Sequence, residues 1–459
     1  MARDPAVAVI DIGKSNAKLA LVDRATRRAL SVRTTVNSVV ASGLYPHHDV
    51  ERLWGWIIEG LRVFAVAADV EAISITTHGA CFVLLHGDQL ALPVLDYEFA
   101  GPENVRDAYA RVRGEFSETL SPDLPNGLNA GRQLYWQSRR YPEEFARIDA
   151  ILPYPQYWAW RLSGVKAAET TSLGSHTDLW QPRNGRYSQL AVAEKWDALF
   201  APLVKPWDTV GEVLPSVARE TGLSPRTRVI AGIHDSNASL LPHLLSRPLP
   251  FAVLSTGTWL IVLAPGGSLD GLDPARDCLA NVDAFGRAVP SSRFMAGREF
   301  EIIAGRSAEP GRSEIESVLR DRIMALPTFA PGTGPFGAQR GRWARNGALV
   351  DSAADLAPGI RSAAASLYTA LVAETCLRLA GAQGPIVVEG PFARNELFLA
   401  ALAGALPRPV IARPDSTGTM AGAVLLALGA DAAPSKEADP PPTPPLDIEA
   451  YAETARALM

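Results

Sequence analysis

Cysteine is scarce in this chain of 459 residues. The three cysteines, Cys81, Cys278 and Cys376, are odd in number and far apart in the sequence. They provide neither the paired spacing of a metal site nor the framework of a disulfide-rich secreted domain. We therefore expect a protein of the reducing cytoplasm.

The chain also lacks an excess of positive charge and any long apolar run. Its formal net charge of −5 gives no basic footprint for nucleic acid and no polybasic patch for a membrane surface. The N-terminus has no signal-peptide core, and no apolar run is long enough to span a bilayer. We therefore expect neither nucleic acid nor a membrane as a partner. The apolar content of 47% fits an ordinary globular protein with two or three domains.

No Walker A sequence, G-x-x-x-x-G-K-[ST], occurs in the chain. Residues 332–337 match G-x-G-x-x-G, but the match contains Pro335 and has no strand-to-helix context. It is therefore not a dinucleotide fingerprint, and a nucleotide must be bound by another scheme.

The most informative stretch is Val-Ile-Ala-Gly-Ile-His-Asp-Ser-Asn-Ala-Ser-Leu-Leu, residues 229–241. Its apolar beginning, residues 229–233, predicts a strand, and the remainder predicts a helix with Ser236 or Asn237 as its cap. Asp235 is then expected at the C-terminal tip of a strand, where open α/β folds bind ligands. A plain helix N-cap is the alternative role for this aspartate.

Near the N-terminus, residues 6–10 and 19–23 predict two strands joined by the polar turn at 11–18, Asp-Ile-Gly-Lys-Ser-Asn-Ala-Lys. The tip of this hairpin presents backbone N–H groups, a hydroxyl and two ammonium groups, which suit a phosphate. The residues concerned are Gly13, Lys14, Ser15 and Lys18. Asp11 suits a hydrated Mg²⁺ ion. An ordinary hairpin turn with surface lysines is the alternative.

An amphipathic helix is predicted at residues 50–65 with Asp49 as its cap, and strands are predicted at 71–76, 81–85 and 92–95. A helix between strands indicates a βαβ unit and a partly parallel sheet. Polar side chains follow these strands, and one more lies in a later hydroxyl-rich stretch: His78, Asp96, Tyr97, Glu98 and His176. Such groups hold sugar hydroxyls, although structural histidines and solvated turns give the same pattern.

A second hairpin repeats the plan of the first. Residues 251–254 and 259–263 predict strands, and Ser-Thr-Gly-Thr at 255–258 predicts a polar turn between them. Gly257 occupies the place that Gly13 has in the first hairpin. This repetition indicates an internal duplication and two related halves.

A short link with proline near residues 246–250 marks the expected boundary between the halves. We therefore expect one domain at residues 1–246 and another at 247–459. Two phosphate-friendly hairpins that face each other would form a ligand cleft between these domains.

Two turns of small residues in the C-terminal half each open a predicted helix. Gly-Pro-Phe-Ala-Arg-Asn at 390–395 follows a strand at 385–389, and Asp-Ser-Thr-Gly-Thr-Met-Ala-Gly-Ala at 415–423 leads into a final Ala/Leu helix. The backbone of such turns suits an adenosine or an α-phosphate, whereas close helix packing is the alternative. Residues 431–445 are rich in proline and predict an extended segment.

Together these segments resemble the FGGY family of carbohydrate kinases, within the actin-like ATPase superfamily. Asp-Ile-Gly-Lys-Ser at 11–15 is similar to the family's first phosphate motif, and Ser-Thr-Gly-Thr at 255–258 is similar to its second. Gly-Ile-His-Asp at 232–235 is similar to the catalytic motif, and residues 390–395 are similar to the adenosine motif. The order and spacing of four motifs carry more weight than any single one.

The resemblance implies an α/β fold of two actin-like, ribonuclease H-like domains with ATP and Mg²⁺ in the cleft between them. It implies that Asp235 is the general base for attack of a sugar hydroxyl on the γ-phosphorus, and that Asp11 and Asp235 lie at the metal. The implied nucleotide and phosphate contacts are Gly13, Lys14, Ser15, Lys18, Thr256, Gly257, Thr258, Gly390, Pro391 and Asn395. The implied sugar contacts are His78, Asp96, Tyr97, Glu98, His176, His234 and Asp235.

The chain departs from the family pattern in two places. Lys14 stands where the family usually has Thr or Ser, and Pro391 and Phe392 replace glycines of the adenosine loop. The region after His78 is closest to kinases of 6-deoxyketoses and pentuloses, so ATP-dependent phosphorylation of such a ketose is the expected reaction. An actin-like nucleotide-dependent switch and a non-catalytic sugar-binding regulator are the alternatives. The expected partners are a sugar and ATP, and a homodimer is left open.

Overall fold

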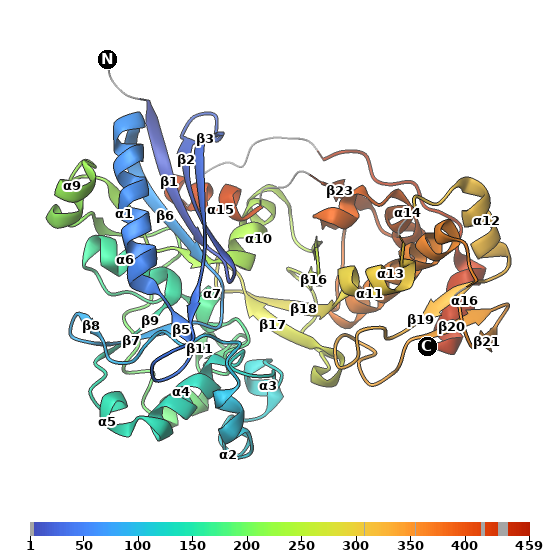
Figure 1. Ribbon diagram of the computed structural model, residues 1–459, viewed down its shortest axis with the longest axis horizontal. Helices are drawn as coiled ribbons and strands as arrows, with labels where there is room; N and C mark the ends of the chain where they lie inside the picture. The colour runs from blue at the N-terminus through green and yellow to red at the C-terminus, as the bar shows by residue number, and fades with distance from the viewer. Residues whose placement is uncertain (1–3, 307, 354, 415–417, 430–438) are drawn as a thin grey trace. The chain divides into compact units, whose positions relative to one another are not determined.

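The computed structural model describes residues 4–306, 308–353, 355–414, 418–429 and 439–459. The chain divides into two compact units, which Figure 1 shows in ribbon form. The first unit comprises Met1–Ser246, Ala280–Ala288 and Thr417–Lys436, and the second comprises Arg247–Leu279, Val289–Ser416 and Glu437–Met459. After leaving the first unit at residue 246, the chain therefore returns to it twice, which a single boundary in the sequence cannot represent.

The first unit is built on a seven-stranded sheet in the order β12-β13-β6-β1-β2-β3, with β14 also paired to β6. The strands are β1 (Pro5–Ile12), β2 (Asn16–Asp23), β3 (Ala29–Val36), β6 (Asp69–Thr77), β12 (Thr209–Glu212), β13 (Arg228–Ile230) and β14 (Ile233–His234). β1 and β2 form an antiparallel hairpin in which Asp11 pairs with Lys18, whereas β6 runs parallel to β1. The predicted hairpin and the partly parallel sheet are confirmed.

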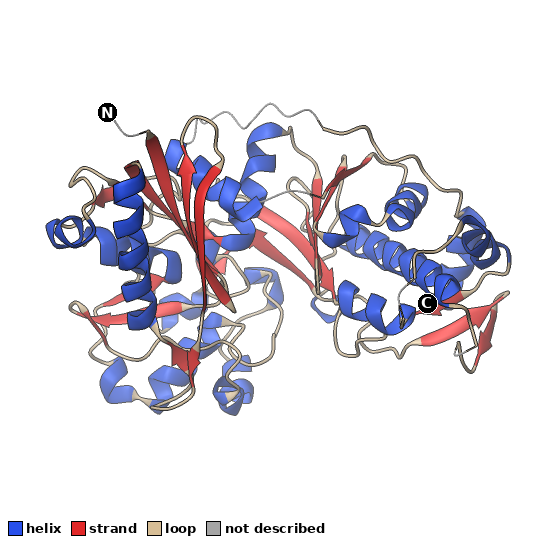
Figure 2. Cartoon of the chain, turned by 45° about the horizontal axis from the view of Figure 1, so that its top comes forward, coloured by secondary structure: helices blue, strands red, loops and turns tan. Residues whose placement is uncertain are grey.

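Helices cover both faces of this sheet (Figure 2). One face packs against α1 (Val50–Ala67) and α6 (Tyr154–Ser163), and the other against α10 (Asp235–Ser246) and α15 (Gly418–Leu428). Ile10 belongs to the first core and Val9 to the second, because successive side chains of a strand point to opposite faces. Burial on both faces explains why β1 is a nearly continuous apolar run.

The predicted amphipathic helix is α1, which extends two residues beyond its predicted end. Its predicted cap is confirmed, since the Asp49 side chain accepts a hydrogen bond of 3.1 Å from the backbone N–H of Arg52. The buried stripe lies at helical spacing and includes Leu53, Ile57, Leu61 and Phe64. α9 (Pro215–Thr221) comes much later in the chain and packs against this helix.

The segment around Asp235 differs from the prediction in two details. The strand predicted at 229–233 is two strands, because Gly232 adopts φ of +89° and lies where a Cβ would be 2.7 Å from a backbone oxygen of β6. α10 begins at Asp235 itself, so Ser236 and Asn237 lie inside the helix. The prediction that one of these two residues caps the helix was wrong.

Between β6 and β12 the first unit contains a second core, which is rich in aromatic side chains. The elements around it are β7 (Phe82–His86), β8 (Gln89–Leu90), α2 (Arg106–Ala110), α3 (Phe116–Thr119), α4 (Ala130–Arg140), α5 (Pro142–Phe145), β9 (Ala150–Pro153), α7 (Thr170–Leu173), β10 (Trp180–Gln181), β11 (Arg186–Tyr187) and α8 (Gln189–Ala193). The prediction of a strand at residues 92–95 was wrong. Pro93 lacks the N–H that a strand interior needs, and only an isolated bridge joins Leu95 to His47, in β5 (His47–His48), which pairs with β4 (Val39–Val40).

The second unit repeats the strand order of the first. Its sheet runs β17-β18-β16-β15-β22-β23, so β23-β22-β15-β16-β18 corresponds to β13-β6-β1-β2-β3. The strands are β15 (Ala252–Thr256), β16 (Leu260–Leu263), β17 (Cys278–Val282), β18 (Ala288–Phe294), β22 (Ile386–Glu389) and β23 (Val410–Arg413). The last three residues of β17 and the first of β18 belong to the segment assigned to the first unit. As in the first unit, the hairpin is antiparallel and the next pairing is parallel. The shared topology supports the predicted duplication.

The core of the second unit forms around α13 (Pro358–Leu379), which is buried along most of its length. The other elements are α11 (Ala296–Ala304), α12 (Arg312–Arg320), β19 (Met324–Leu326), β20 (Arg342–Arg345), β21 (Ala348–Val350), α14 (Glu396–Ala405) and α16 (Glu449–Leu458). In the part of the chain that the structure describes, no helix combines the length and the apolar character needed to cross a membrane. Residues 415–417 and 430–438, where the second small-residue turn begins and the proline-rich segment lies, are outside the described residues.

Candidate active site

The tip of the β1–β2 hairpin is a tight, braced turn. The Gly13 N–H donates to the Asn16 carbonyl oxygen over 2.9 Å. Asn37 braces the turn, because its side-chain amide donates to the Gly13 carbonyl oxygen over 2.8 Å. The side chains of Ser15 and Lys18 are exposed. Two of the predicted phosphate-binding groups are therefore accessible on a turn of fixed shape.

Asp11 and Asp235 lie at neighbouring strand ends. β1 and β14 each run parallel to β6, so the two carboxylates flank the end of the same strand. Burial raises the pKa of Asp11 to about 6, and the negative charge of Asp235 contributes to that rise. Burial also raises the pKa of Asp235, whose side chain keeps 30% of its area exposed, while the nearby His78 and a 2.6 Å hydrogen bond from the Ser236 N–H oppose the rise. Two carboxylates that repel each other in one place form a site for a proton or a cation.

His234 touches Asp235 through its side chain as well as through the peptide bond. Its Nε2 lies 3.2 Å from a carboxylate oxygen of Asp235. Burial lowers the pKa of His234 to about 4, so the imidazole is neutral at pH 7 and the contact is not an ion pair. Gly79 makes room for this ring, since a Cβ at that position would lie 2.7 Å from Nε2.

A buried hydrogen-bond chain fixes the backbone just before Asp235. The His234 N–H donates to the Thr171 hydroxyl over 3.1 Å, and that hydroxyl donates to the Glu169 carboxylate. The same carboxylate accepts the Thr171 N–H over 2.8 Å, and burial raises the pKa of Glu169 to about 7. Sequence reasoning missed both Glu169 and Thr171. Their signal was a carboxylate immediately before the hydroxyl-rich stretch.

Lys14 contacts the predicted sugar-binding residues. Its ammonium group lies 2.7 Å from Asp96, 3.2 Å from Glu98 and 5.2 Å from the centre of the Tyr97 ring. The sequence predicts a phosphate contact for this lysine, whereas here two carboxylates neutralise its charge. The hairpin tip and residues 96–98 are thereby brought together in one cluster.

His78 belongs to the same cluster. Its backbone N–H donates over 2.8 Å to the carbonyl oxygen of Ile12, at the end of β1, and its Nδ1 lies 2.9 Å from the Gly79 carbonyl oxygen. Its ring packs edge-on against Tyr97 with 5.6 Å between ring centres. The structure therefore places His78, Tyr97 and the hairpin next to one another in the first unit.

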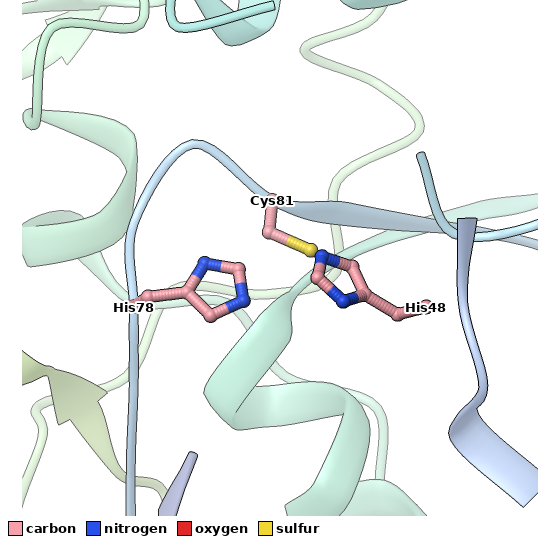
Figure 3. A group of neighbouring side chains, drawn as sticks. All are labelled: His48, His78 and Cys81. Carbon is pink, nitrogen blue, oxygen red and sulfur yellow. The ribbon is translucent and has the colours of Figure 1, made fainter. Parts of the chain in front are cut away.

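Two residues that sequence reasoning did not single out, His48 and Cys81, lie beside His78 (Figure 3). All three side chains are buried, and one donor atom of each lies within 4.8 Å of those of the other two. Figure 3 shows the Cys81 sulfur and the His78 ring directed toward the His48 ring. The sequence signals were the closeness of Cys81 to His78 and the His-His pair before α1.

His176 is placed by a different loop. Its Nδ1 lies 2.9 Å from the Leu128 carbonyl oxygen, and its backbone has a left-handed φ of +47°. The loop that contains Gly127 and Leu128 also contacts the cluster, since the Gly127 N–H donates to the Tyr97 carbonyl oxygen over 2.8 Å. Asp178, two residues later, is buried, and its carboxylate forms an ion pair of 2.8 Å with the Arg113 guanidinium. This aspartate therefore has a structural role.

The second unit contains a cavity of about 540 Å³. Its lining residues are Gly257, Thr258, Gly297, Arg298, Phe300, Glu301, Pro391, Phe392 and Asn395. The predicted phosphate turn and the predicted adenosine turn therefore line one pocket. Sequence reasoning missed the contribution of α11, which supplies the lining residues Gly297, Arg298, Phe300 and Glu301.

Close backbone packing shapes this pocket. Gly390 has φ of +80°, and a Cβ there would lie 2.1 Å from the Thr256 carbonyl oxygen. The buried Thr256 hydroxyl donates to the Glu389 carbonyl oxygen and accepts from the Phe392 N–H over 3.1 Å. Thr256 therefore joins the two turns rather than lining the pocket.

Asn395 has a structural task as well as a place in the pocket wall. Its side-chain oxygen accepts the Phe398 N–H over 2.9 Å and caps α14, and its amide nitrogen donates to Ser366 over 3.0 Å. Of the predicted nucleotide-binding residues, Gly257, Thr258, Pro391 and Asn395 line the cavity.

The repeated sheet and its two units define a two-domain α/β protein of the actin-like class. A solved structure described as a carbohydrate kinase from Novosphingobium aromaticivorans superposes with a TM-score of 0.90. It is 37% identical in sequence, and the match covers 100% of this chain and 99% of that chain.

The FGGY family of carbohydrate kinases, N-terminal domain, matches residues 6–242, and the carbohydrate kinase FGGY, C-terminal domain, matches residues 248–437. The chain therefore belongs to the FGGY family of carbohydrate kinases. It is 25% identical over 300 residues to the L-xylulose/3-keto-L-gulonate kinase of Escherichia coli (strain K12), covering 62% of this chain and 58% of that protein. It is 27% identical over 277 residues to a probable L-xylulose kinase of Pasteurella multocida (strain Pm70), covering 55% and 54%. The chain thus spans just over half the length of these curated relatives.

Proposed function

We propose that the protein is an ATP-dependent kinase that transfers the γ-phosphoryl group to a hydroxyl of a sugar. The observation that carries this proposal is the position of Asp235, at a strand end beside Asp11, with its preceding peptide held by Thr171. Membership of the FGGY family supports the same reaction class.

In the proposed reaction Asp235 accepts the proton of the sugar hydroxyl while the hydroxyl oxygen attacks the γ-phosphorus. The bond from phosphorus to the bridging oxygen breaks, and ADP leaves with that electron pair. A raised pKa makes the carboxylate a stronger base. The neutral His234 imidazole packs beside it, with Nε2 3.2 Å from a carboxylate oxygen.

Asp11 and Asp235 would hold Mg²⁺. The pair fits such an ion, because hard carboxylate oxygens suit magnesium and the two groups repel each other when no cation is near. Bound magnesium supplies charge neutralisation to the phosphates. The protein's own contribution is to keep the two carboxylates at fixed strand ends.

For the nucleotide we propose the pocket of the second unit. Backbone around Gly257 and Thr258 would contact phosphate, and Phe300, Pro391 and Phe392 would form its apolar wall. In the first unit the hairpin residues Gly13, Ser15 and Lys18 would contact phosphate, and Lys14 would instead hold Asp96 and Glu98 in place.

His78, Asp96, Tyr97, Glu98, His176 and His234 remain the proposed sugar contacts. The activities for which the two curated relatives are named favour a ketose such as a pentulose as the substrate, while the 6-deoxyketohexose alternative stays within the same proposal.

A coupled assay of ADP release over ketoses, aldoses and polyols tests the activity. We expect turnover with at least one ketose and formation of its phosphate ester. A nucleotide-dependent switch or a non-catalytic regulator predicts the opposite: nucleotide or sugar binding without a phosphorylated product anywhere in the panel. That result would refute the kinase proposal.

Thr171→Val should lower kcat about tenfold, because losing one buried hydrogen bond and leaving its partners unpaired costs about 1–2 kcal/mol. The change keeps the size of the side chain but removes the partner of the His234 N–H. Thr171→Ser keeps the hydroxyl and is the matched control. Steady-state kinetics with both variants measures the effect. An unchanged kcat in Thr171→Val would mean that this hydrogen bond does not position Asp235.

Asp11→Asn should stabilise the protein at pH 8 while impairing turnover. The pKa of Asp11 in the folded state, about 6, lies above its ordinary value of 3.8, so ionisation of this carboxyl opposes folding. The cost is absent below about pH 4 and complete above about pH 6, where it reaches at most about 3 kcal/mol. Thermal denaturation without magnesium should therefore show a higher Tm than wild type at pH 8 and an equal Tm at pH 4. If the Tm of Asp11→Asn differed from the wild-type Tm by the same amount at pH 8 and at pH 4, the raised pKa would not belong to Asp11.

A further inference from the structure

On the basis of the kinase activity proposed above, we propose that the sugar site selects a neutral polyhydroxy sugar and rejects sugar acids, and that His48 helps to set this specificity. The juxtaposition that carries the proposal is a pair of buried imidazoles with unpaired ring nitrogens beside a lysine whose charge is already neutralised.

The two imidazoles have hydrogen-bonding capacity that the protein leaves unused. His48 is 1% exposed, and neither of its ring nitrogens has a partner; His78 is 5% exposed, and its Nε2 has none. Their ring centres are 5.1 Å apart, and both rings pack against Tyr154. Buried polar atoms are usually paired, so these nitrogens point to a ligand with donors and acceptors. Hydroxyl groups supply both.

The charge state of the imidazoles decides between a hydroxyl and a carboxylate. Burial lowers the pKa of both His48 and His78, and the positive charge of Lys14 contributes. Neutral imidazoles hydrogen-bond to hydroxyls but form no ion pair with a carboxylate. The Lys14 ammonium group already forms ion pairs with Asp96 at 2.7 Å and with Glu98 at 3.2 Å.

The surroundings add negative charge. Burial is the main cause of the raised pKa of Asp11 and of Tyr97, and the negative charge of Asp235 adds to the rise in both. A substrate carboxylate would bring a further negative charge to a place where Lys14 is already neutralised. A buried unpaired charge is costly, and sites built for hydroxyl groups discriminate strongly.

A metal ion is the competing occupant of the His48–His78–Cys81 group, because imidazole and thiolate ligands suit Zn²⁺. The two occupants predict different behaviour. A sugar-binding group is insensitive to chelators, whereas a metal group loses its occupant with a strong chelator and regains it with added Zn²⁺.

The first experiment compares neutral ketoses with sugar acids on the full-length protein. Xylulose and ribulose are tested against gluconate and 2-ketogluconate, by calorimetry without ATP and by kcat/KM with ATP. We expect a ketose to bind and to exceed every acid by about 100-fold or more in kcat/KM. An acid within tenfold of the best ketose would overturn the proposal, as would sugar binding that disappears with EDTA and returns with Zn²⁺.

Calorimetry separates this proposal from the proposed activity. Ketose binding with no turnover would refute the kinase and leave the selectivity intact. Turnover of an acid alone would refute the selectivity and leave the kinase intact. No binding of any sugar would refute both.

Variants locate the selectivity. Asp96→Asn leaves Lys14 with only the exposed Glu98, so the ratio of acid to ketose kcat/KM should rise about tenfold, the effect of about 1.4 kcal/mol. His48→Gln should raise the ketose KM about tenfold and leave the KM for ATP unchanged. His86→Gln, at the exposed end of β7, is the matched control. If His48→Gln raised the KM for the ketose and the KM for ATP equally and also lowered the Tm, His48 would serve the fold alone. That result would overturn its part in specificity.

Discussion

Asp235→Asn should lower kcat about 1,000-fold, the range expected when a general base is removed. The amide has nearly the same shape as the carboxylate, and its oxygen can still accept the hydrogen bond from the Ser236 N–H. It cannot accept the sugar proton. The KM for ATP and the calorimetric affinity for the sugar should therefore change little, and a coupled ADP assay measures the loss.

The control for this variant is Asp88→Asn, which removes an exposed aspartate from the turn between β7 and β8. It should retain wild-type kinetics. If Asp235→Asn kept kcat within tenfold of wild type while folding normally, another group would have to be the base, and the role proposed for the 232–235 motif would be wrong.

Gly257→Val should raise the KM for ATP about 100-fold, which corresponds to about 2.7 kcal/mol of lost binding. A Cβ on Gly257 meets no atom within 4 Å, so an added side chain begins in open space at the pocket wall. There it would occupy the volume proposed for the nucleotide. The Tm and the sugar affinity should stay at wild-type values, and an ATP titration at saturating sugar measures the effect.

Two other glycines give this experiment its contrast. Gly55 in α1 also has nothing within 4 Å of a Cβ but lies in the first unit, so Gly55→Val should leave the KM for ATP unchanged. Gly297→Val should lower the Tm instead, because its Cβ would lie 2.4 Å from the Gly257 carbonyl oxygen. A normal KM for ATP in Gly257→Val would mean that the nucleotide binds elsewhere.

The sheet framework could be predicted from the sequence because its signals are local. The apolar runs at 6–10 and 251–254, each followed by a polar turn, were sufficient to predict both hairpins. Alternation and helical periodicity are properties of neighbouring residues. The same holds for α1 and its Asp49 cap.

Details that depend on distant partners could not be predicted. The break at Gly232 follows from its close approach to β6, and the pairing of Lys14 with Asp96 joins residues far apart in the chain. A sequence shows a lysine in a turn and a carboxylate after a strand, but it does not show that they meet.

The candidate site was recovered in the same uneven way. Asp11 and Asp235 stand at strand ends that the pattern defines, so their places were predictable. Glu169 and His48 act, in the present proposals, through buried contacts with other elements. The hydroxyl-rich stretch beside Glu169 and the His-His pair that contains His48 do not show those contacts. Chemistry that depends on burial becomes visible only when the packing is known.

The central claim is that one carboxylate, Asp235, deprotonates a sugar hydroxyl for phosphoryl transfer from ATP. Its most direct test is a single-turnover measurement of label transfer from [γ-³²P]ATP to the best ketose, with wild type and Asp235→Asn compared at saturating substrate. We predict rapid formation of labelled sugar phosphate by the wild type and transfer slowed about 1,000-fold in the variant. Equal transfer by both proteins, or label that appears only in inorganic phosphate, would contradict the claim.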